Sequence, residues 1–272
     1  MTPETLASLH RRYFDVLLLG MILLLWLETA FYQIPLKSER ARAIHAAHNF
    51  GIWVIAVLVA NQLVGNYLLD IPQRPHEVGF GVFHWIPIPF IVQLLLGILL
   101  LDLADYLFHV LAHRVQWLWL LHSVHHSDTD LDVTTSLRFH PLEAAASLTW
   151  TFAVLILMGL PLWLLAVRSL FSLPFTLMQH MNVAFPASLD KALRWILITP
   201  HLHRIHHSPL EQENNRNFGS TLSVWDRLFG TLHEHSAPKA MVYSLAKLKN
   251  SDWQSVWGML KTPISARKMG FL

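Results

Sequence analysis

The chain has 272 residues, of which 53% are hydrophobic and only 14% are charged. Soluble domains carry about 25% charged residues, and the mean hydropathy here is +0.39, so the composition is typical of a membrane protein. The formal net charge of +2 gives no reason to expect nucleic acid as a partner. Cysteine is absent, which excludes disulfides, thiolate metal ligands and cysteine nucleophiles. Any metal must therefore be bound by nitrogen and oxygen.

Four apolar runs are long enough to enter or cross a membrane. They cover residues 14–34, 50–69, 90–108 and 144–184, and a transmembrane helix needs roughly 20 such residues. The last run is too long for one crossing and is broken at Gly159-Leu160-Pro161. It predicts a helical hairpin whose two ends return to the same side of the bilayer. The expected fold is all-α, a polytopic membrane helical bundle with a histidine-rich helical cap.

The same pattern predicts three parts of the chain. Residues 1–89 form an N-terminal transmembrane region, residues 90–232 a histidine-box core that includes the hairpin, and residues 233–272 a C-terminal amphipathic tail. In the tail, a helix is predicted over residues 241–260, where four apolar residues recur at helical spacing: Trp253, Val256, Trp257 and Leu260. Such a helix either lies in the membrane interface or packs on the cap, and the pattern fits both.

The distribution of lysine and arginine sets the expected orientation. With three crossings before His109, the loop at residues 35–48 lies on the same side as the histidine-rich segments. That side carries most of the basic residues outside the spans: Lys37, Arg40, Arg42, Arg114, Arg138 and the basic C-terminal region. The opposite side carries Arg11, Arg12 and Arg74. Because cytosolic loops are enriched in lysine and arginine, the histidine face is expected to be cytosolic, although Arg11 and Arg12 argue the other way.

Eight histidines fall into three short boxes with the spacings H-x-x-x-H, H-x-x-H-H and again H-x-x-H-H: His109 and His113; His122, His125 and His126; His203, His206 and His207. Residues three and four apart lie on one face of a helix, so each box can direct its imidazoles at one point. Imidazole is a common ligand of redox-active transition metals, and eight ligands exceed what one ion can use. The boxes therefore predict a two-metal site.

Three more histidines lie near the boxes. His140, in RFHPLE, and His180, in MQHMN, stand at the two ends of the predicted hairpin. Both are expected to be metal ligands or direct neighbours of ligands. His201 is a weaker candidate, because on a helix it points away from the box that begins two residues later.

Two carboxylates precede the first box within an apolar run. Asp105 lies four residues before His109, and Asp102 lies seven before it, so both share its helix face. A carboxylate at membrane depth is costly unless it has a partner. The functional expectation is that Asp105 accepts the non-ligating N–H of an imidazole and so supports catalysis. The alternative is an ion pair with Arg114 or a charge at the membrane interface.

The residues alone leave three classes of protein open. One is a non-catalytic membrane zinc- or metal-binding protein, although structural zinc sites take four ligands and close. Another is a hydrolase- or deaminase-like zinc enzyme that acts without oxygen. The third is an enzyme whose two metal ions keep open positions for oxygen or water, and the number of histidines favours it.

The boxes and their surroundings resemble the fatty acid hydroxylase/sterol desaturase superfamily of membrane non-haem iron oxygenases. The similarity covers roughly residues 95–232 and is carried by four segments: DLADYLFHVLAHRVQWLWLLHSVHHS (102–127), RFHPLE (138–143), TPHLHRIHHS (199–208) and NFGSTLSVWDRLFGT (217–231). Within the superfamily the pattern looks most like the bacterial sterol-desaturase-like proteins and the alkylglycerol monooxygenases. Many members carry a further H-x-x-x-H pair near the end of the last hairpin; here His180 is present but its partner position is Ala184.

The resemblance implies a mostly helical membrane protein with a cytosolic cap over two iron ions, which zinc can replace in a purified sample. By motif, the ligand role passes to the eight histidines of the three boxes. The implied reaction is hydroxylation or desaturation of a membrane lipid (fatty acyl, sterol or ether lipid) by O2, and the motifs do not separate these from ether cleavage. A multi-pass protein of a bacterial inner membrane is expected.

The electrons must come from outside the chain, because the sequence contains no haem-attachment motif, flavin fingerprint or iron–sulfur motif. A separate reductase, an electron-transfer protein or a pterin is the expected donor. The lipid is expected to enter from the bilayer, between the spans around residues 90–108 and 144–182.

Overall fold

The computed structural model describes residues 3–65, 79–86, 88–234, 245, 248 and 250–268, with the side chains of the first helix described at residue 12 and from residue 15 onward. Most of these residues are helical. The β pairing among them is limited to two isolated bridges, Tyr32 with Val183 and Leu197 with Leu222. The all-α expectation is confirmed.

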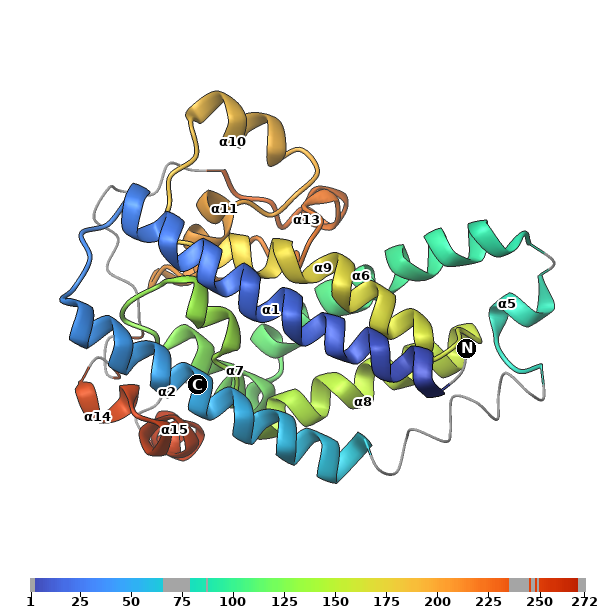
Figure 1. Cartoon of the computed structure of the whole chain (residues 1–272), viewed down its shortest axis with the longest axis horizontal. Coiled ribbons are helices and arrows are strands. Elements are labelled where there is room, and N and C mark those ends of the chain that lie inside the picture. Colours follow the sequence, from blue (N-terminus) through green and yellow to red (C-terminus); the bar gives the residue numbers. More distant parts are fainter. Residues whose placement is uncertain are drawn as a thin grey trace.

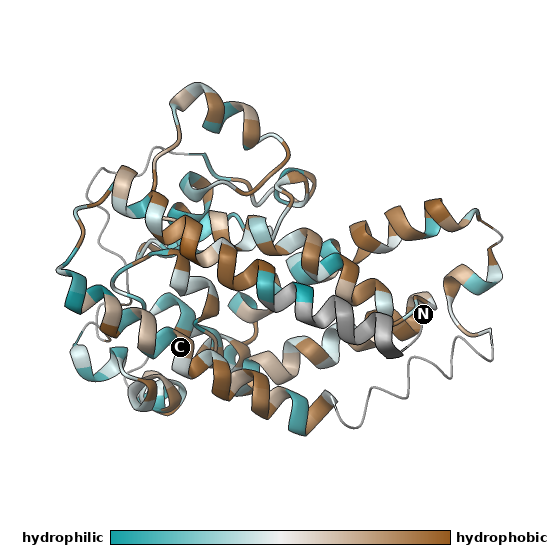
Figure 2. Cartoon of the chain, in the orientation of Figure 1, coloured by the Kyte–Doolittle hydropathy of each residue, from teal (hydrophilic) through white to brown (hydrophobic). Residues whose placement is uncertain are grey.

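Five helices of 18 residues or more form the bundle in this part of the chain (Figure 1): α1 (Pro3–Phe31), α2 (Glu39–Ala60), α6 (Phe90–Arg114), α8 (Pro141–Met158) and α9 (Trp163–His180). A π-helical turn, η1 (Asn61–Gly65), extends α2. The closest pairings are α2 with α8 and α1 with α9. Figure 2 shows long hydrophobic stretches in these helices.

Within the described residues, three helices are long and apolar enough to cross a membrane: Glu39–Gly65, Phe90–Arg114 and Pro141–Met158. The break predicted in the fourth apolar run lies between α8 and α9. There Gly159 ends α8 with a φ of 71°, in the left-handed region that glycine adopts without strain. The chain is thus a helical membrane protein.

Short helices gather at one end of the bundle (Figure 1), opposite the small helix α5 (Val82–Trp85). Between α6 and α8 lie α7 (Gln116–His126) and the 3-10 helix η2 (Val133–Leu137). After α9 come the four helices that we call the cap: α10 (Ala187–Leu193), α11 (Pro200–His206), α12 (Glu211–Asn214) and α13 (Val224–Leu228). The last described helices are α14 (Ser251–Gln254) and α15 (Val256–Lys268).

The C-terminal helix differs from its prediction over residues 241–260. Residues 241–244 lie outside the described part, and the helical pattern is interrupted at Ser255, whose backbone is extended between α14 and α15. Val256, Met259 and Leu260 of α15 pack against Ile52 and Val124. This face packs on α2 and α7, whereas Trp257 and Ile264 on the same helix are exposed.

A buried polar network joins α2 to the segment that follows α7. Arg138 is fully buried and donates hydrogen bonds to the Val124 carbonyl, Asn49 Oδ1 and Ser127 Oγ. Asp128, also buried, pairs with His45 of α2 at 2.9 Å. Burial alone would raise the pKa of Asp128, but His45 and Arg138 hold it below its usual range. The network fixes the loop after α7 to a membrane-spanning helix.

Replacing Arg138 with methionine tests how much this network stabilises the bundle. The change leaves buried acceptors on Val124 and Asn49 without their donor and removes one cationic neighbour of Asp128. We expect the free energy of unfolding to fall by about 3 kcal/mol, measured by thermal unfolding in detergent. The control is Lys37→Met, which breaks the more exposed pair with Asp130 on the same loop and should cost under about 1 kcal/mol. Equal losses in the two variants would contradict this account.

Candidate metal centre

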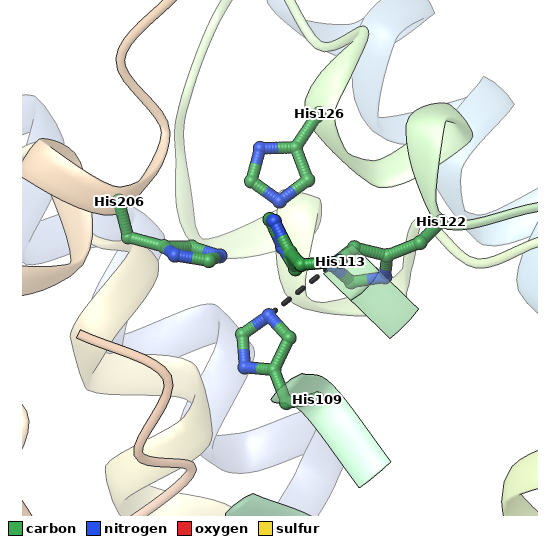
Figure 3. Close-up of side chains that lie close together, drawn as sticks. All are labelled: His109, His113, His122, His126 and His206. Atoms are coloured by element: carbon green, nitrogen blue, oxygen red, sulfur yellow. Dashed lines mark hydrogen bonds between the residues drawn. The ribbon is translucent and has the colours of Figure 1, made fainter. Parts of the chain in front are cut away.

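Nine histidines converge in two groups. The five-histidine group contains His109, His113, His122, His126 and His206, and the four-histidine group contains His125, His180, His203 and His207. Within each group one ligand nitrogen per residue lies within 4.8 Å of all the others. Figure 3 shows the five-histidine group, whose rings approach a common point from several helices.

The two H-x-x-H-H boxes do not each form one group, because they are divided between the two. On α7, His122 and His126 are four residues apart and join the five-histidine group, while His125 joins the other. The third box divides the opposite way: His203 and His207 join the four-histidine group and His206 the other. Successive residues on a helix are rotated by about 100°, so one box presents an i, i+4 pair to one point and the remaining histidine to another.

The outward nitrogens of several rings are fixed by acceptors. The Nδ1 atoms of His109, His180 and His206 lie 2.8, 2.9 and 2.7 Å from the carbonyl oxygens of Phe218, Thr176 and Arg216. His125 Nδ1 lies 3.3 Å from the Arg138 carbonyl. An imidazole that donates from Nδ1 has its lone pair on Nε2, the arrangement that ligating histidines use.

Several ring nitrogens of these histidines have no hydrogen-bond partner among the described residues. They are Nε2 of His113, His126 and His206, together with Nδ1 of His113 and of His203. Other inward nitrogens meet only each other: His203 Nε2 lies 2.9 Å from His180 Nε2 and 3.1 Å from His207 Nε2. Buried polar atoms are normally paired, so this arrangement fits metal ions bound by nitrogen.

Burial also keeps several of these rings neutral. It lowers the pKa of His206 to about 3, and burial together with neighbouring histidines holds the pKa of His125, His126, His203 and His207 well below the usual range. A neutral imidazole can coordinate a metal without first losing a proton. Four or five nitrogen donors suit iron, zinc or copper, so the side chains fit the metals that the boxes implied.

The structure separates His140 and His201 from these groups. His140 precedes α8, and its Nδ1 accepts a hydrogen bond from the Leu142 N–H, so the ring caps that helix. His201 lies on α11 beside the third box but belongs to neither group. His180, in contrast, lies in the four-histidine group.

The two carboxylates of α6 have partners other than histidine. Asp105 forms an ion pair with Arg168 of α9. Asp102 Oδ2 accepts hydrogen bonds from Trp225 Nε1 at 2.8 Å and from the Leu222 N–H, which ties α6 to the cap. Neither oxygen contact reaches the first box, so the structure does not bring Asp105 to an imidazole as the spacing suggested.

Among the described residues, the carboxylate that contacts a histidine of the two groups is Glu143. Its Oε1 lies 2.6 Å from His122 Nδ1, both side chains are buried, and its Oε2 has no hydrogen-bond partner among the described residues. Sequence reasoning missed this residue, although it ends the RFHPLE segment that carried part of the resemblance. The signal was therefore present in the motif, but the spacing from His122 did not reveal the contact.

Asp226 orders the loop whose Phe218 carbonyl contacts His109 of α6. Its carboxylate accepts hydrogen bonds from the backbone N–H groups of Phe218 and Gly219 and from the Thr231 hydroxyl. The Phe218 carbonyl in turn accepts from His109 Nδ1. The NFG and WDRLFGT parts of the last matched segment thus act together to position one imidazole.

A cavity of about 490 Å³ opens beside both groups. His109 and His122 of one group and His125, His180 and His203 of the other lie in its wall. Most of the remaining wall is apolar and comes from α2, α6, α8 and α9, with residues such as Ala56, Ala60, Phe108, Ala144 and Leu148. The two histidine groups therefore face a hydrophobic space inside the helical bundle.

The Glu143 contact predicts a specific loss of metal. Glu143→Gln removes the charge that orients His122, and loss of such an outer partner lowers metal affinity by roughly 10–100-fold. Iron content after dialysis against a graded chelator measures this loss. The control is the double variant Asp105→Asn with Arg168→Gln, which removes a carboxylate that pairs with an arginine instead of a histidine of either group, and it should retain iron. If the double variant lost iron and Glu143→Gln did not, Asp105 would be the orienting carboxylate instead.

The lowered histidine pKa values predict acid sensitivity of the metal-free protein. The unfolded chain takes up protons on these histidines near pH 6.5, whereas the folded chain resists them down to about pH 3 for His206. The contribution of these histidines to stability should therefore be level between pH 8 and 7 and fall as the pH drops below 6.5, by about 1.4 kcal/mol per histidine at pH 5.5. Thermal unfolding of chelator-treated protein measures the slope. Replacing His203 and His207 with glutamine should make it shallower, and a flat profile from pH 7 to 5 would refute the argument.

Comparison with known proteins agrees with this geometry. Residues 94–231 match the profile of the fatty acid hydroxylase family. The ornithine lipid hydroxylase OlsE of Rhizobium tropici is 35% identical over 173 residues, which cover 62% of this chain and 49% of that protein. The human alkylglycerol monooxygenase is 32% identical over 144 residues, 53% of this chain and 31% of that protein.

Mouse cholesterol 25-hydroxylase is 27% identical over 162 residues, 56% of this chain and 52% of that protein. No solved structure matches significantly. The chain thus spans about half or less of the length of the curated relatives described above. The matched segment contains both histidine groups and half of the sequence, and the chain belongs to the fatty acid hydroxylase family.

Proposed function

We propose that this protein is an integral membrane, O2-dependent di-iron oxidoreductase that hydroxylates or desaturates a lipid. The observation that carries the proposal is the pair of convergent histidine groups at the wall of an apolar cavity inside a membrane bundle. Membership of the family supports the reaction class. Cleavage of an unactivated C–H bond needs an oxidant that no side chain supplies, and two iron ions with O2 provide one.

The proposed ligands are the eight histidines of the three boxes together with His180. The five-histidine group would hold one ion and the four-histidine group the other. His140 was proposed from the sequence as a further ligand, and its capping contact favours a structural role beside the site. Asp105, proposed as a supporting carboxylate, lies in the cavity wall where a substrate would contact it.

The residues of the chain perform three tasks around the metals. The carbonyls of Phe218, Arg216 and Thr176 and the carboxylate of Glu143 hold four rings in the tautomer that binds metal. The apolar wall excludes water from the lipid chain and from the reacting carbon. The open ends of the two groups toward the cavity let the substrate approach both ions from one side.

The substrate proposal is a membrane lipid that enters from the bilayer between α6 and the α8–α9 hairpin. The names of the relatives point to ornithine lipids, alkylglycerols and cholesterol as substrates of those proteins. All three combine a long apolar part with a polar group, and a lipid of that kind suits a cavity with apolar walls and a few charged side chains.

The remaining expectations form part of the same proposal. The N-terminal region 1–89, the core 90–232 and the tail 233–272 would act as anchor, catalytic core and covering segment, and the family match at 94–231 is close to the proposed core. The histidine face would be cytosolic in a bacterial inner membrane. A separate reductase, electron-transfer protein or pterin would deliver the electrons.

The competing reading is a membrane protein that binds zinc without catalysis, and activity with controlled metal content separates the two. The protein is purified with iron, and lipid products are measured by mass spectrometry under 16O2 and 18O2. We expect one labelled oxygen atom in a hydroxylated product, or O2-dependent loss of hydrogen in a desaturated one. Products that form equally without O2 would overturn the proposal.

Variants assign the activity to the histidine groups. Changing His125 and His126 to alanine removes one ligand from each group and should lower product formation at least 100-fold together with iron content. The matched control is His201→Ala on α11, which lies beside the third box but outside both groups, and it should keep most activity. Full turnover in the double variant would contradict the proposed site.

A further inference from the structure

The cavity wall contains an ion pair that the metal centre does not use. Asp105 of α6 and Arg168 of α9 are paired, both belong to the wall, and their side chains are 20% and 15% exposed. Asp105 lies within α6, which is long and apolar enough to span a membrane. Charged residues at such depth are costly and tend to mark a substrate path. Arginine and aspartate in a pair still offer further donors and acceptors to a ligand.

A second polar group lies nearer the histidines. Gln179, the residue before His180, is only 5% exposed and belongs to the cavity wall. Its side-chain oxygen has no hydrogen-bond partner among the described residues. Buried acceptors without a donor are rare in native proteins. Gln179 is thus an acceptor at the cavity whose missing donor a bound molecule would supply.

Both polar features are close to the histidines along their helices. Asp105 lies one turn, about 5.4 Å of helix, before His109, and Gln179 is adjacent in sequence to His180. The wall supplied by Ala56, Ala60 and Leu148, in contrast, offers only apolar contact. A ligand that satisfies both kinds of wall has an alkyl chain and a polar group, with the polar group at the histidine end.

We propose that the cavity binds a lipid that carries a hydrogen-bond donor, an N–H or O–H group, within a few bonds of the carbon that reacts. Gln179 Oε1 accepts a hydrogen bond from that group, and the Asp105–Arg168 pair binds the polar atoms next to it. The alkyl chain lies along α2 and α8. The statement that a nearby carbon reacts rests on the proposed oxygenase function. The preference for binding a donor-bearing lipid does not depend on that function.

This assignment limits the substrate class. A plain hydrocarbon segment far from any polar group would leave Gln179 without a donor and would place an alkyl chain against an ion pair. The chemistry of the wall therefore selects oxidation close to the polar part of the lipid over oxidation in the middle of a chain. An amide and an alcohol both provide the donor, and matched probes separate them.

Binding is measured on iron-loaded protein in lipid nanodiscs without O2, so that no turnover occurs. Two pairs of probes differ only in the donor: N-ethylpalmitamide against ethyl palmitate, and a secondary alcohol of the same chain length against its ketone. Competition with tritiated probe gives the four affinities. We expect the donor-bearing member of at least one pair to bind about tenfold tighter, and the pair with the larger ratio identifies the donor as N–H or O–H.

Gln179→Leu should remove this preference, because the acceptor is lost. The matched control is Gln93→Leu, the same change on α6 at a residue that bonds the Ile88 carbonyl outside the cavity, and it should keep the preference. Asp105→Asn with Arg168→Gln should weaken all four probes while iron is retained. The inference is overturned if neither pair discriminates in the unchanged protein, if Gln179→Leu still discriminates, or if the charge-free double variant binds every probe normally.

The outcome is separable from that of the proposed function. A protein that prefers donor-bearing lipids but forms no O2-dependent product would retain the subsite and lose the oxygenase assignment. A protein that oxidises lipids without any such preference would retain the oxygenase assignment and lose the subsite.

Discussion

The structure depends on holding nine imidazoles together in a buried space. Protonated rings would repel one another at these distances, and burial lowers the pKa of rings such as His206 and His207 until they stay neutral. Neutral rings that face each other are still left with unpaired nitrogens. A metal ion would resolve this conflict by taking the inward lone pairs, while carbonyls and Glu143 accept the outward N–H groups. The outward contacts give three backbone segments a role in orienting the rings: the loop at Phe218, the segment at Arg216 and the end of α9 at Thr176.

Helix geometry explains how the histidines of three boxes are divided between two histidine groups. A box of the form H-x-x-H-H presents two faces, and α7 and α11 present them in complementary ways: α7 gives two rings to the first group and one to the second, and α11 gives one and two. Each helix therefore bridges both groups. Tilting either helix would disturb both groups together, so the polar network through Arg138 and Asp128, which fixes the loop after α7, has a direct bearing on the site.

The sequence predicted those parts of the molecule that depend on local periodicity. Apolar runs gave the membrane helices and the break at Gly159, and histidine spacing gave the box residues. It could not predict the division of the boxes between two groups, because that depends on how α7 and α11 face each other in space. It also could not decide whether His140 caps a helix or binds a metal. Both roles are compatible with a histidine just before the helix that starts the hairpin. Asp105 has a plausible partner four residues away in His109, but the fold offers Arg168, which is distant in sequence and carries a full charge.

Chemistry and substrate choice are carried by different parts of this chain. The histidine groups lie wholly within the segment that matches the family, residues 94–231. The cavity wall extends beyond that segment, because Trp53, Ala56 and Ala60 of α2 line it as well. Side chains at these positions set the width of the space for the alkyl chain, and nothing in the shared boxes constrains them. The relatives reported above are named for lipids as different as alkylglycerols and cholesterol. A substrate preference of this chain would be encoded in the wall, whose polar side chains include the Asp105–Arg168 pair and Gln179 with its unpartnered oxygen.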